Sequence, residues 1–80
     1  MTDERKKLLN DAANALDKLY KFIGTQRNEE TLVYCLAKDL DEGREVITVE
    51  IGKGTYRVNV ECDSVPAIIR EVVDATVLKI

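Results

Sequence analysis

The chain has 80 residues, of which 45% are hydrophobic and 34% charged, and its formal net charge is −3. This size and composition predict one small α+β domain over residues 1–80 and argue against a disordered chain. The sequence contains no histidine, which rules out Ser-His and Cys-His nucleophile pairs and the commonest metal ligand. The acidic balance also makes nucleic-acid binding through a basic face unlikely.

The N-terminal segment has the apolar spacing of one face of a helix. Thr2 or Asp3 can cap its start, and Gly24 is suited to end it. We therefore predict a helix over residues 3–23, followed by a polar connector over 24–30. Its apolar face would be formed by Leu9, Ala12, Leu16, Leu19 and Ile23, widened by Leu8, Ala15 and Phe22.

Residues 31–40 fit either a strand or a helix. Leu32, Leu36 and Leu40 match a helical stripe, whereas the Thr-Leu-Val-Tyr segment at 31–34 has strand-forming residues. A turn at Leu40 to Gly43, with Gly43 in the left-handed conformation, would start a hairpin that pairs Leu40 with Arg44. This register sets Ala37 opposite Ile47, Cys35 opposite Val49 and Val33 opposite Ile51. Because apolar residues then share one face, we favour the strand.

A second hairpin is predicted around Gly52-Lys53-Gly54. A type II′ turn at Gly52-Lys53 pairs Ile51 with Gly54, while a turn centred on Lys53-Gly54 pairs Ile51 with Tyr56. The sequence does not decide between these two registers. Both place the same apolar side chains on one face of the sheet, namely Ile47, Val49, Ile51, Tyr56, Val58 and Val60.

The last element is predicted to be a helix that starts after Asp63 or Ser64, with Pro66 in its first turn. The tail, residues 76–80, can continue the helix, form an edge strand or fray. The whole chain is then a two-layer sandwich of helix, three-stranded antiparallel meander and helix. The alternative, with residues 28–41 helical, is a fold of three helices plus one β-hairpin.

The predicted strands place an apolar patch on the sheet face opposite the helices. The patch consists of Leu32, Tyr34, Leu36 and Val46, and it lies beside an edge strand. Such patches usually mark an interface. The sequence therefore favours a non-enzymatic interaction module that binds itself, as a homodimer, or docks another protein.

A second hypothesis starts from the acidic turn that contains Asp39, Asp41, Glu42 and Glu45. A negative surface of this kind can imitate a nucleic-acid backbone. The chain would then be a phage-type acidic inhibitor, encoded by a mobile genetic element and directed at a basic partner.

No residue pattern indicates catalysis, a cofactor or a metal site. The predicted strand pairing keeps Cys35 and Cys62 beyond disulfide range, and neither has a neighbouring base in the sequence. The order of elements is also that of the double-stranded-RNA-binding domain, but Arg70 is the only basic residue between 64 and 71. The longest apolar run is far too short to span a membrane, and no signal peptide is evident, so we expect a cytoplasmic protein.

Overall fold

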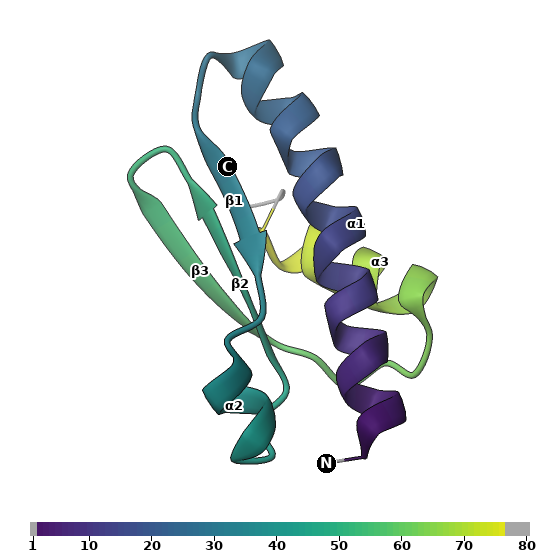
Figure 1. The fold of residues 1–80 in the computed structure, drawn as a ribbon. Helices are drawn as coiled ribbons and strands as arrows, with labels where there is room; N and C mark the ends of the chain where they lie inside the picture. The colour runs from purple at the N-terminus through teal and green to yellow at the C-terminus, as the bar shows by residue number, and fades with distance from the viewer. Residues whose placement is uncertain (1, 77–80) are drawn as a thin grey trace.

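The computed structural model describes residues 2–76 of the chain, and the predicted alternatives for residues 77–80 lie outside that range. A three-stranded antiparallel sheet with the strand order β1-β2-β3 has two long helices on one face (Figure 1). This arrangement confirms the predicted order of helix, three-stranded meander and helix. The elements are α1 (Asp3–Arg27), β1 (Thr31–Tyr34), α2 (Ala37–Asp41), β2 (Val46–Ile51), β3 (Gly54–Asn59) and α3 (Val65–Thr76).

Helix α1 begins where the sequence predicts and ends one turn later than predicted. Thr2 caps its start by accepting a hydrogen bond from the Arg5 N–H at 3.2 Å. At the other end Asn28, not Gly24, takes the left-handed conformation, with φ 56°. Gly24 lies within the helix, and a Cβ there would be 2.5 Å from the Glu29 carbonyl oxygen and 2.8 Å from the Thr31 side chain. The glycine therefore permits close packing between α1 and β1.

The predicted extended conformation of residues 31–40 is correct only as far as Tyr34. Beyond it, Ala37–Asp41 form the short helix α2. Gly43 is left-handed, with φ 78°, as predicted, but it ends this helix rather than making a hairpin loop. The Arg44 N–H donates to the Asp39 carbonyl at 2.6 Å and the Gly43 N–H donates to the Leu40 carbonyl at 3.1 Å. Together these bonds form the Schellman motif of a helix end.

The inserted helix changes the register of the first hairpin. Val33 lies opposite Val49, and Thr31 lies opposite Ile51, so the predicted pairing is wrong by two residues. A shift of two preserves which face each side chain occupies, because side chains alternate with a period of two. The alternative with residues 28–41 entirely helical is also wrong. In the second hairpin Ile51 pairs with Gly54, which selects the first of the two predicted registers.

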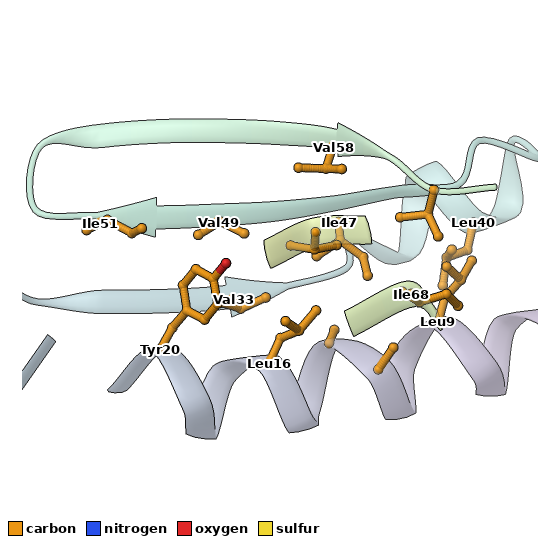
Figure 2. Packing of buried hydrophobic residues seen from close by; sticks show 14 residues of the cluster. Leu9, Leu16, Tyr20, Val33, Leu40, Ile47, Val49, Ile51, Val58 and Ile68 are labelled. Carbon is orange, nitrogen blue, oxygen red and sulfur yellow. The ribbon is translucent and has the colours of Figure 1, made fainter. Parts of the chain in front are cut away.

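The core lies between the sheet and the two long helices (Figure 2). Leu16 and Tyr20 point from α1 toward Val33 and Val49, and Leu40 of α2 closes one end beside Leu9 and Ile68. Ser64 caps α3, as predicted, by accepting from the Ala67 N–H at 3.3 Å. None of the described helices is long and apolar enough to cross a membrane.

Candidate interaction surface

The predicted apolar patch is only partly exposed. Leu32 is 45% exposed, and because it alternates with the buried core residue Val33, its side chain lies on the sheet face away from α1 and α3. Tyr34 and Leu36 are half-buried, and Val46 is buried, with 8% exposure. The structure therefore keeps Leu32 as the apolar centre of this face and removes Val46 from the surface.

Helix α2 accounts for the burial of Val46. Asp39, in α2, contacts Arg57 of β3 at 3.3 Å, and Arg57 lies opposite Thr48 on the free face of the sheet. This contact brings α2 over that end of the face, where Val46 and Thr48 are both buried. The rest of the face, around Leu32, has no such cover from α2.

The two edges of the sheet differ in their hydrogen bonding. In β1, Leu32 and Tyr34 bond to β2, so the N–H of Val33 points away from the sheet. That N–H donates to the Asp17 carboxylate of α1 at 3.0 Å. A helix side chain thus occupies the outward-facing hydrogen-bonding position at the middle of β1, where an added strand would bind.

The β3 edge has no such cover. The ladder to β2 uses Gly54, Tyr56 and Val58, and it continues to the Val60 N–H, which donates to the Glu45 carbonyl at 2.8 Å. The alternate residues, Thr55, Arg57 and Asn59, are exposed, and their backbone N–H groups face away from the sheet. Among the described residues, none of these N–H groups has a hydrogen-bond partner. The open edge was not among the sequence-based predictions, although the meander order alone makes β3 an outer strand.

The predicted acidic turn is largely neutralised by neighbouring cations. Asp39 is buried, and Arg44 Nη2 lies 2.7 Å from its Oδ1, in an ion-pair contact without hydrogen-bond geometry. The other three carboxylates are also paired: Asp41 with Lys6 at 2.8 Å, Glu42 with Arg44 at 2.6 Å and Glu45 with Arg5 at 2.7 Å. These pairs weaken the negative field that the inhibitor hypothesis requires.

Two apolar side chains of α1 are exposed, although their spacing in the sequence predicts that they belong to the apolar face of the helix. Leu19 is 41% and Phe22 63% exposed. Their spacing correctly predicts a helix. However, the sheet and α3 cover a narrower strip of the helix surface than that spacing implies. They form a second apolar area, on a different element from Leu32.

The two cysteines are free thiols and lack an activating environment. Burial, with a smaller contribution from the Asp39 charge, raises the pKa of Cys35 to about 11. Desolvation is also the main cause that raises the pKa of Cys62, with further contributions from Glu71 and neighbouring carboxylates. Both shifts disfavour the thiolate that nucleophilic chemistry needs.

The described residues hold no group of three or more side chains arranged to bind a metal ion. A hollow lies between the end of α1 and the β1–β2 region, lined by polar and charged side chains together with Leu32. Its carboxylates come from Glu29, Glu30 and Glu50. Comparisons with protein-family models, curated proteins and solved structures find no match to this chain.

Proposed function

We propose that the chain is a non-enzymatic protein–protein interaction module that uses the free face of its sheet. The observation that supports this proposal best is the exposure of Leu32, 45%, on a face that neither long helix covers. Half-buried Tyr34 and Leu36 extend the apolar surface around it. An apolar centre with a polar surround is the usual composition of a protein interface.

The polar surround comes from neighbouring strands. Leu32 lies opposite Glu50 of β2, and Glu50 lies opposite Thr55 of β3 on the same face. A partner that covers Leu32 would therefore meet a carboxylate and a hydroxyl at the rim of the contact. Such rim groups contribute more to the choice of partner than to affinity.

Affinity capture from native lysate with three tagged chains tests this function. The wild-type chain should retain a partner, or a second copy of itself, and Leu32→Asp should lose it because a charge would have to be buried in the contact. Asn14→Asp, on the exposed surface of α1, is the matched control and should behave as wild type. Equal capture by wild type and Leu32→Asp would refute this use of the face. The cytoplasmic location stays a prediction, which fractionation of expressing cells would test.

A further inference from the structure

We propose that the open edge of β3 binds the β3 strand of a second copy in antiparallel orientation, so that two three-stranded sheets become one continuous sheet. The inference goes beyond the proposed function, because it names a second contact, at the strand edge of β3, and a second copy of the chain as its partner. Its starting point is the row of outward-facing backbone groups at Thr55, Arg57 and Asn59. Unpaired strand edges of this kind are templates for strand addition.

The register follows from which residues face outward. An antiparallel ladder across this edge must pair the outward-facing residues of one β3 strand with the outward-facing residues of the other. A two-fold axis at Asn59 satisfies this requirement and places Asn59 opposite its own counterpart. The same axis places Arg57 opposite residue Glu61 of the second copy. The bond from the Val60 N–H to the Glu45 carbonyl shows that the pairing with β2 continues one residue past β3, to Val60, and Glu61 follows directly.

Charge selects this register over its neighbour. An axis at Arg57 would set two guanidinium groups directly opposite each other, which is unfavourable. With the axis at Asn59, each Arg57, whose side chain is 56% exposed, meets an exposed Glu61. An axis at Asn59 thus makes the strand charge-complementary to itself, whereas an axis at Thr55 would set Arg57 opposite Lys53 and an axis at Arg57 would set it opposite its own counterpart. This complementarity is the reason for choosing a second copy as the occupant of the edge.

The other face of the joined strands is compatible with the same register. Half-buried Tyr56 falls opposite half-buried Cys62 of the second copy, so two partly apolar side chains meet at the rim of the core. The N–H of Glu61 already donates to the Glu71 carboxylate at 3.0 Å. The ladder therefore continues at this position through the carbonyl of Glu61 rather than through its N–H.

Light scattering over a concentration series, with a proline substitution and its control, tests the contact. Asn59→Pro removes an N–H that faces away from β2, so the fold should be retained while the dimer is lost. Asn59→Ala keeps the N–H and should dimerise as wild type does. Glu61→Lys sets like charges across the edge and should raise the dimer dissociation constant about tenfold. Because it leaves the backbone unchanged, this variant decides the test if the proline variant does not fold.

A cysteine at the axis gives an independent readout. Directly opposed residues in a hydrogen-bonded antiparallel pair have Cα atoms about 5.5 Å apart, which a disulfide can span. Asn59→Cys should therefore form a covalent dimer under mild oxidation, whereas Thr55→Cys and the wild-type chain should not. A wild-type chain that stays monomeric to about 1 mM, or a dimer that survives both Asn59→Pro and Glu61→Lys, would overturn the proposal. Loss of capture by Leu32→Asp would in either case still support the proposed function.

Discussion

The backbone N–H of Val33 donates to the carboxylate of Asp17 at 3.0 Å, and this bond joins the outer strand β1 to helix α1. The same carboxylate oxygen accepts from Lys21 at 2.6 Å, one helical turn along. The free hydrogen-bonding position at the middle of β1 is thereby filled from within the molecule. Among the described residues, the N–H groups of Thr55, Arg57 and Asn59 in β3 have no such partner, and the comparable contact from the Glu61 N–H to Glu71 lies beyond the end of that strand, so the two edges of the sheet differ.

Asp17→Ala is expected to destabilise the fold and open the β1 edge. It leaves the N–H of Val33, a residue only 4% exposed, without its partner. The expected loss is about 1–3 kcal/mol of the free energy of unfolding, measured with urea. Lys21→Ala is the control, because it removes only a surface ion pair and should cost less than about 0.5 kcal/mol. Equal losses in the two variants would show that the strand bond contributes nothing.

The stability should also fall in acid through the same carboxylate. Burial acts to raise the pKa of Asp17, but the hydrogen bonds from Lys21 and from the Val33 N–H outweigh it, and the pKa lies below its ordinary value of 3.8. The unfolded chain then binds more protons than the folded chain as the pH decreases. This contribution is complete above the unfolded-state pKa and is lost as the pH falls through the folded-state pKa.

We therefore expect a free energy of unfolding that changes little between pH 7 and about pH 5 and decreases below about pH 4. Asp41, whose pKa is lowered mainly by its hydrogen bond with Lys6, acts in the same direction. Urea titrations at a series of pH values measure the slope, and Asp17→Asn should make it shallower. A slope that this variant leaves unchanged would assign the acid sensitivity to other groups.

The buried carboxylate of Asp39 predicts that removing both of its arginine partners destabilises the fold far more than removing either one. Its side chain is 1% exposed, whereas those of its two cationic partners, Arg44 and Arg57, are 52% and 56% exposed. Removing both arginines leaves a buried charge unpaired, and we expect a loss on the order of 3 kcal/mol. Either arginine alone should cost about 1 kcal/mol or less, because the other remains. Denaturant unfolding of the single variants and the double variant would contradict this account if the effects were simply additive.

The hydroxyls of Tyr20 and Thr76 connect α1 to the last described turn of α3 in the core. Thr76 Oγ1 donates to the Val72 carbonyl at 2.8 Å, so the proton in its contact with Tyr20 comes from the tyrosine. Tyr20→Phe should cost about 1 kcal/mol. Thr76→Val should cost more, because it leaves the buried tyrosine hydroxyl unpaired. Thermal unfolding of the double variant, Tyr20→Phe with Thr76→Val, should show less than the sum of the two losses, and a strictly additive result would argue against the bond.

The fold was predictable because the alternation of apolar and polar residues in strands and the capping residues of helices are local features of the sequence. The pattern from Ile47 to Val60 assigns β2, β3 and their core face, and Thr2 and Ser64 mark the starts of the two long helices. The error at residues 35–41 has a tertiary cause. The segment satisfies both strand and helix patterns, and the burial of Leu40 in the core together with the pairing of Asp39 favours the helix.

The candidate surface was less predictable than the fold. The alternation of side chains along a strand correctly placed Leu32 on the sheet face away from the long helices. The exposure of a side chain also depends on what a neighbouring element covers, as the burial of Val46 near α2 shows. Edge properties depend on contacts distant in the sequence. Nothing near Val33 indicates that Asp17 will reach it, and nothing near Thr55 indicates that the edge there remains open.

The bond between Asp17 and Val33 limits how large an assembly built on strand addition can grow. A molecule whose sheet has two open edges can add further copies indefinitely and form fibrils, whereas a molecule with one open edge binds only one neighbour. With the middle of β1 occupied and β3 paired to a second copy as we propose, the addition of copies along the sheet would stop at the dimer.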